Sequence, residues 1–213
     1  MIDLLERISM GLCGLVVALV GAGYFLVGMR SSIPPELLVE VPAYDITQAV
    51  NQGTPAALPG VSPDRAQMLA QSVDMPKIRE NLRKNGVNAG RIESTLKPIP
   101  PATYEYVRSE ANWTPELRKY KSQLVPGSTS RLQITEGVNE NTVLYKLGFR
   151  DGDVIELLDG ESVEFSEQSM LRYREMFYDA VDRIQSGGSI SVTVTRRGKP
   201  VNLLFTLDGI QGG

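Results

Sequence analysis

The amino-acid sequence predicts an α+β protein that consists of a single N-terminal transmembrane helix, a Pro-rich tether and a compact C-terminal domain. Three observations lead to this prediction. An apolar run without charged side chains lies near the N-terminus, six prolines follow between residues 34 and 63, and apolar and polar residues alternate in short runs after about residue 128. These patterns are typical of a membrane span, an extended linker and a packed domain that contains strands, respectively.

The composition argues against nucleic-acid binding and against the commonest kinds of catalysis. The chain has 22 Lys and Arg against 25 Asp and Glu, so no basic excess is present to neutralise a phosphate backbone. It has no His and a single Cys, which excludes Ser-His-Asp, Cys-His, zinc and haem sites by residue type. A Ser-Lys or carboxylate pair is possible in principle, but no spacing singles one out. We therefore expect no enzyme activity, no catalytic residue, no metal, no cofactor and no small-molecule substrate.

The apolar run from Ile8 to Met29 is long enough to cross a membrane as a helix. At about 1.5 Å per residue it reaches about 33 Å, against a hydrocarbon core of about 30 Å. A cleaved signal peptide is the competing interpretation, but the run exceeds a typical signal core and no clear small-residue cleavage site follows it. A lipoprotein site at Cys13 is also a poor fit, because Leu12 precedes it where a small residue is usual. The sequence favours an uncleaved anchor.

Three small residues recur every four positions within this run, at Gly14, Ala18 and Ala22. That spacing places them on one helix face, where a second transmembrane helix can approach closely. Gly and Ala are also common in membrane helices without such a role. The pattern indicates packing against other transmembrane helices of a complex, with the second interpretation left open.

A reporter fusion tests the orientation of the predicted span. Arg7 and Arg30 flank it almost symmetrically, but the next basic residue after Arg30 is Arg65, so the following segment suits translocation. A reporter that is active only outside the cytoplasm, fused after Gly213, should therefore be active in a bacterial host. Activity of a cytoplasmic reporter at the same position would reverse the predicted orientation.

Prolines and aromatic residues mark the segments between the span and the C-terminal domain. Residues 30–101 are expected to form a Pro-rich linker with one helix over residues 63–85, interrupted near Met75-Pro76 and ended at Gly86. Residues 102–127 contain the only Trp, Trp113, and are interpreted as an aromatic lead-in to the next domain.

The pattern after residue 128 predicts a small domain over residues 128–208, with a tail at 209–213. Arg131 to Thr135 alternates as a half-buried strand, and a short helix after Thr142 is closed by Gly148. An amphipathic helix is expected near residues 166–185. Two alternating runs around Arg197-Gly198 predict a closing β-hairpin over about residues 190–207.

This order of elements resembles a bacterial PDZ domain. The residues that carry the resemblance are Leu147-Gly148-Phe149, Gly152-Asp153-Val154-Ile155 and the turn Asp159-Gly160, and it covers roughly residues 120 to 208. From the residues themselves, the three glycines suit turn positions with positive φ, and Asp153 suits a strand entry where it accepts backbone hydrogen bonds. We therefore interpret this stretch as building the domain rather than carrying chemistry.

The resemblance implies a partner-binding groove beside the strand that contains Leu132, Gln133 and Ile134, where a partner segment adds as an extra strand. Val125 and Gly127, in the stretch Val125-Pro126-Gly127-Ser128, are the candidates for a loop that receives a terminal carboxylate. The alternative is that this stretch is only a turn, because Pro126 removes one amide donor.

A short N-terminal tail (residues 1–7), one membrane helix, a tether and a PDZ-like domain together resemble the inner-membrane component C of type II secretion systems. That resemblance implies a single-pass protein of the bacterial inner membrane with a periplasmic C-terminal domain, acting as a scaffold that binds protein partners in an envelope assembly. The alternative is a regulatory PDZ subunit that presents substrates to a separate membrane protease. A membrane protease is disfavoured by the lack of His.

Overall fold

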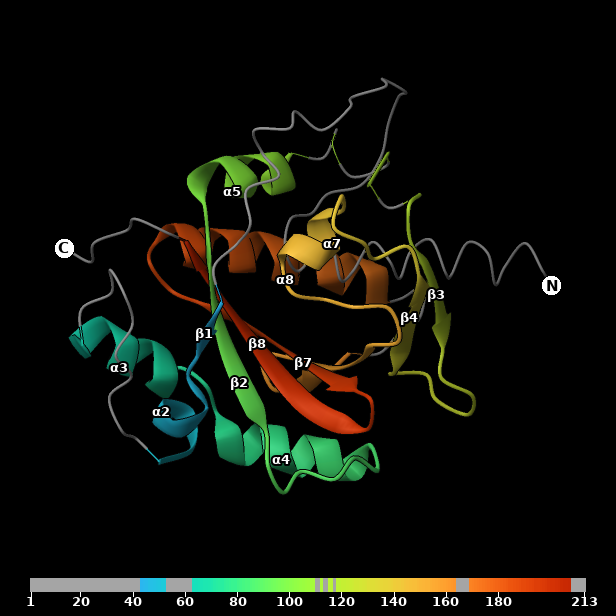
Figure 1. The fold of residues 1–213 in the computed structure, drawn as a ribbon, viewed down its shortest axis with the longest axis horizontal. Helices are drawn as coiled ribbons and strands as arrows, with labels where there is room; N and C mark the ends of the chain where they lie inside the picture. The colour runs from blue at the N-terminus through green and yellow to red at the C-terminus, as the bar shows by residue number, and fades with distance from the viewer. Residues whose placement is uncertain are drawn as a thin grey trace.

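The computed structural model describes residues 43–52, 63–109, 112, 115–116, 118–163 and 169–207, without the side chains at positions 63, 107, 169–175 and 177. Within this part of the chain, eight strands form one mixed sheet in the order β1-β2-β8-β7-β5-β4-β3, with β6 paired to β5 beside that path (Figure 1). The elements follow one another as β1 Tyr44–Asp45, α2 Thr47–Gln52, α3 Pro63–Gln71, α4 Met75–Lys84, β2 Glu93–Ile99, α5 Pro101–Arg108, β3 Lys121–Leu124, β4 Leu132–Glu136, α7 Val143–Lys146, β5 Val154–Leu158, β6 Glu161–Ser162, α8 Ser169–Gln185, β7 Ile190–Arg196 and β8 Lys199–Leu207.

Helices cover both faces of this sheet. One face carries an apolar cluster that includes Leu203 and Phe205 of β8 and packs against α5, α7 and α8. The other face carries Leu96 and Leu204, which pack against α2, α3 and α4. Because side chains alternate along a strand, β8 contributes to both clusters and lies between two helical layers.

The predicted fold class is wrong, because residues 93–99 of the expected linker belong to the same sheet as the C-terminal strands. Residues 93–99 form β2, which pairs in parallel with β8 over its whole length, from Glu93 opposite Val201 to Ile99 opposite Leu207. The protein is a mixed α/β structure in which one sheet crosses the boundaries predicted at residues 101 and 128.

Pro98 makes this strand hard to recognise from the sequence. The direction in which its backbone faces explains why the strand forms despite the proline. The amide of Ile46 donates to the carbonyl oxygen of Ser94 at 2.9 Å, so Ser94 directs its backbone groups toward β1. Backbone groups alternate in direction along a strand, so those of Pro98 point to the same side as those of Ser94, away from β8. β1 has two residues, opposite Thr95 and Leu96, and does not reach Pro98. The amide that proline lacks is therefore not required by the parallel ladder.

No helix in the described part of the chain combines the length and apolarity needed to cross a membrane. The predicted span from Ile8 to Met29 lies outside the described residues, as do its small residues Gly14, Ala18 and Ala22. Trp113 of the aromatic lead-in also lies outside them.

The predicted interruption of the helix over residues 63–85 is confirmed. α3 ends at Gln71 and α4 begins at Met75, where the Asp74 side chain accepts a hydrogen bond from the amide of Lys77 at 3.0 Å. Pro76 occupies the first turn, where its missing amide has no intrahelical partner to lose. Both helices pack on the sheet instead of extending away from it.

The turns around β5 have the conformations that the glycines indicated. Gly148, Gly152 and Gly160 have φ of 97°, 87° and 77°. The Asp153 carboxylate accepts the amide of Arg150 at 2.9 Å and a two-point ion pair from Arg196 at 2.7 and 2.8 Å. This stretch therefore serves the fold, as predicted.

Candidate partner-binding edge

β3 is the terminal strand on one side of the described sheet. Among the described strands it pairs only with β4 (Figure 1). In that pairing Gln123 lies opposite Gln133 and Leu124 opposite Leu132. The alternation of backbone hydrogen bonds fixes which groups face outward. On β4, Ile134 exchanges hydrogen bonds with Asp153 and Gly152, so its neighbour Gln133 faces β3.

The same alternation continues along β3. The amide of Val125 donates to the carbonyl oxygen of Arg131 at 2.9 Å, so Val125 and Gln123 face β4. Leu124, between them, directs its N–H and C=O groups away from β4. This outward side of β3 is called the β3 edge below.

The predicted groove residues Leu132, Gln133 and Ile134 do not lie at an open edge. They belong to β4, which is paired on one side with β3 and on the other with β5. Leu132 and Ile134 are buried in the core, with 0% and 1% exposure. The expectation that this strand borders open space is therefore wrong, because the sequence interpretation assigned no strand to residues 121–124.

Val125 and Gly127 lie in the turn between β3 and β4. The amide of Ser128 donates to the carbonyl oxygen of Val125 at 3.0 Å, and the amide of Ser130 donates to the Ser128 hydroxyl at 3.2 Å. Gly127 takes φ of 78°, which a non-glycine residue rarely adopts. The geometry is that of a hairpin turn in which the amides of Ser128 and Ser130 donate within the turn, and carboxylate binding at this turn stays a prediction.

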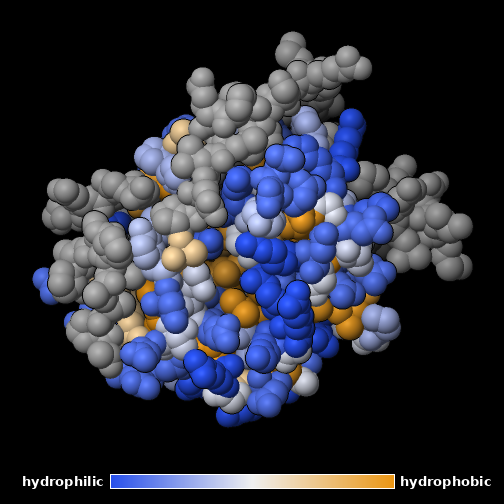
Figure 2. All heavy atoms as spheres, viewed as in Figure 1, coloured by the Kyte–Doolittle hydropathy of each residue, from blue (hydrophilic) through white to orange (hydrophobic). Residues whose placement is uncertain are grey.

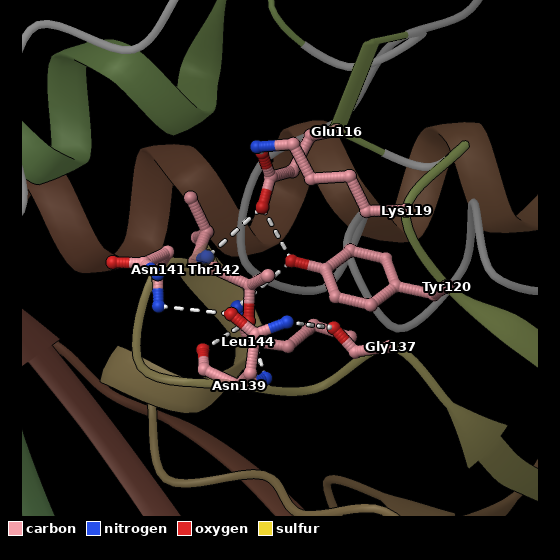
Figure 3. Close-up of polar contacts among 9 residues, drawn as sticks. Glu116, Lys119, Tyr120, Gly137, Asn139, Asn141, Thr142 and Leu144 are labelled. Carbon is pink, nitrogen blue, oxygen red and sulfur yellow. Dashed lines mark hydrogen bonds and ion pairs between the residues drawn. The ribbon is translucent and has the colours of Figure 1, made fainter.

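A buried polar network anchors the start of β3 to α7 (Figure 3). The Tyr120 hydroxyl, one residue before β3, donates a short hydrogen bond to the Glu116 carboxylate and accepts the amide of Leu144 at 3.2 Å. The same Glu116 oxygen accepts the amide of Val143 at 2.9 Å. The other Glu116 oxygen pairs with the Lys119 ammonium at 2.6 Å.

The environment keeps the Tyr120 hydroxyl protonated. Burial raises the pKa of Tyr120 well above its ordinary value, and the nearby Glu116 carboxylate raises it further. The phenol therefore remains a hydrogen-bond donor across the physiological pH range.

Sequence reasoning missed β3 and its anchor. The available signal was the alternation in Lys121-Ser122-Gln123-Leu124, in which Lys121 and Gln123 are exposed and Ser122 is buried. Four residues are too few to distinguish such a strand from a loop by pattern alone. Glu116 and Tyr120 gave no sequence signal, since their shared partner α7 lies more than twenty residues further on.

A cleft of about 600 Å³ lies between α3, the start of α4 and the loop after α8. Two of its cationic side chains take part in ion pairs: Arg183 with Asp159 at 2.5 Å, and Lys77 with Glu161 at 2.7 Å. These pairs hold the turn between β5 and β6 against α8 and α4. The geometry gives them a structural role.

Comparisons of the chain with family models, with curated proteins and with solved structures find no significant match. Its function is therefore inferred from its sequence patterns and its geometry.

Proposed function

We propose that this chain is a non-catalytic scaffold that binds an extended segment of a partner protein along the β3 edge. The observation that carries the proposal is the position of β3 at the end of the described sheet, with Leu124 directing its backbone groups away from β4. An extended segment can add to such an edge as a further strand, through backbone hydrogen bonds.

The side chains on and around β3 support this mode of binding. Lys121 and Gln123 are exposed, whereas Ser122 is buried and Leu124 is half-buried against the core. Figure 2 shows mostly hydrophilic residues on the viewed face, with apolar residues only in small areas between them. Backbone pairing with an alternating apolar and polar segment therefore fits this face better than the burial of a broad apolar surface.

A proline substitution at the β3 edge tests the proposal. The probe is a peptide selected from a random displayed library by the full chain in detergent micelles. Leu124→Pro should weaken its affinity by at least about tenfold, because proline removes the outward N–H and is tolerated on an edge strand. Leu124→Ala should lose less than about threefold, because alanine keeps that donor while removing most of the same side chain.

Melting temperatures of both variants control for the fold. Equal affinity losses in the two variants would attribute the effect to the side chain and contradict strand addition. Full affinity in a folded Leu124→Pro chain would place the binding site elsewhere. Proteins that co-purify with the full chain then distinguish the scaffold from the alternative role: components of an envelope assembly support a scaffold, and a protease supports substrate presentation.

A further inference from the structure

The first turn of α7 is capped by side chains that precede it by more than twenty residues. Its N-cap residue Thr142 makes no side-chain cap, because the Thr142 hydroxyl accepts the amide of Asn139 at 3.1 Å and donates to the carbonyl oxygen of the same residue at 2.7 Å. The amides of Val143 and Leu144 are instead satisfied by Glu116 and Tyr120. These donors are ones that a helix normally caps locally.

The polar network of Glu116 and Tyr120 is buried, and Tyr120 directly precedes the first residue of β3. Glu116 is 1% exposed and Tyr120 is 6% exposed. Figure 3 shows the Tyr120 ring reaching from the start of β3 toward Glu116 and the first turn of α7. The start of the strand is thereby held against a helix instead of depending on its pairing with β4 alone.

We propose that Tyr120 and Glu116 are positioning residues that hold β3 in its extended conformation before a partner segment arrives. This inference rests on the proposed function of the β3 edge. A strand that is already ordered loses less conformational entropy on binding than one that must be ordered by the partner. Losing the hydrogen bond between Tyr120 and Glu116 should therefore lower the affinity of the β3 edge for a partner segment and increase the local opening of β3.

The test compares Tyr120→Phe with Tyr104→Phe in the full chain. Both residues are buried tyrosines whose hydroxyls donate hydrogen bonds, Tyr104 to the carbonyl oxygen of Val181 at 3.3 Å. Tyr120→Phe should accelerate hydrogen exchange of the β3 amides by about tenfold relative to those of β7 and β8. The affinity of the selected peptide should also fall, by up to about tenfold, because losing a hydrogen bond to a charged group favours the open form of β3 by at least that factor. Tyr104→Phe should change neither the exchange ratio nor the affinity.

Glu116→Gln provides a second variant that keeps the side-chain shape and an acceptor oxygen. It should show smaller effects of the same kind, because the Tyr120 hydroxyl and the Val143 amide still find an acceptor. This variant keeps the test informative if Tyr120→Phe fails to fold.

The possible outcomes separate this inference from the proposed function. If Tyr120→Phe accelerates exchange equally in all strands, the network stabilises the whole fold and the inference is overturned. Faster exchange in β3 with unchanged peptide affinity also overturns it. If Leu124→Pro leaves the peptide affinity unchanged in an otherwise wild-type chain, the proposed function of the β3 edge fails. The role of Tyr120 and Glu116 in binding then fails with it.

Discussion

Replacing Arg131 by Met should lower the free energy of unfolding of the full chain by about 3 to 5 kcal/mol, the usual cost of breaking a buried ion pair from one side. Glu156 is fully buried, and Arg131 donates to both of its oxygens, at 2.9 and 2.8 Å. Thr195 and Asn85 donate to the same carboxylate at 2.8 and 3.2 Å. Without the guanidinium, the carboxylate would stay in the core without a countercharge.

Urea denaturation measures this loss, and Lys121→Met is the matched control. Lys121 pairs with Glu136 at 2.6 Å, but both side chains are largely exposed. The control should therefore change the free energy of unfolding by less than about 1 kcal/mol. Equal changes in the two variants would show that Glu156 is solvated in solution.

Leu96→Ala should destabilise the chain by about 2 to 5 kcal/mol, the range found for truncating a buried leucine. Leu96 lies in the middle of β2 with 0% exposure and packs in the cluster that joins the sheet to α3 and α4. Met68→Ala on α3, where the side chain is 62% exposed, should stay within about 0.5 kcal/mol.

This pair of variants distinguishes the observed sheet from a tethered domain. If residues 43–99 were only a linker, Leu96→Ala would leave urea unfolding unchanged. A single transition that moves to lower urea in Leu96→Ala would show that β2 unfolds together with the rest of the sheet.

The elements with local signals were predictable from sequence. The closing hairpin is confirmed as β7 and β8, with Arg197 and Gly198 at φ of 49° and 78° in its turn. The strand at Leu132–Glu136 and the short helix before Gly148 are also confirmed. Each of these has alternation or a glycine-closed turn within a few residues, so neighbouring positions carry the information.

The elements that depend on distant partners were not predictable. β2 contains Lys97 and Pro98, which are unusual in a strand, and its pairing partner β8 is the last strand of the described chain. No local pattern indicates a parallel neighbour that far away. The predicted C-terminal domain began at residue 128, so the segment that forms β2 was assigned to the linker over residues 30–101.

The candidate site shifted for the same reason. Leu132 and Ile134 were correctly placed on one face of a strand, but the position of that strand within the sheet depends on its neighbours. Once β3 is present on its outer side, the edge moves to residues 121–124. A sequence pattern reports which face of a strand is buried, and it does not report which strand is last in the sheet.

The central position of β8 has a consequence for how the protein folds during synthesis. β8 follows every other described strand in the chain, yet it lies between β2 and β7. Until a ribosome has made residues 199–207, β2 and β7 are both without the neighbour that joins them. The early strands must then wait for a long-range pairing, which slows folding and leaves apolar edges accessible to aggregation or to chaperones.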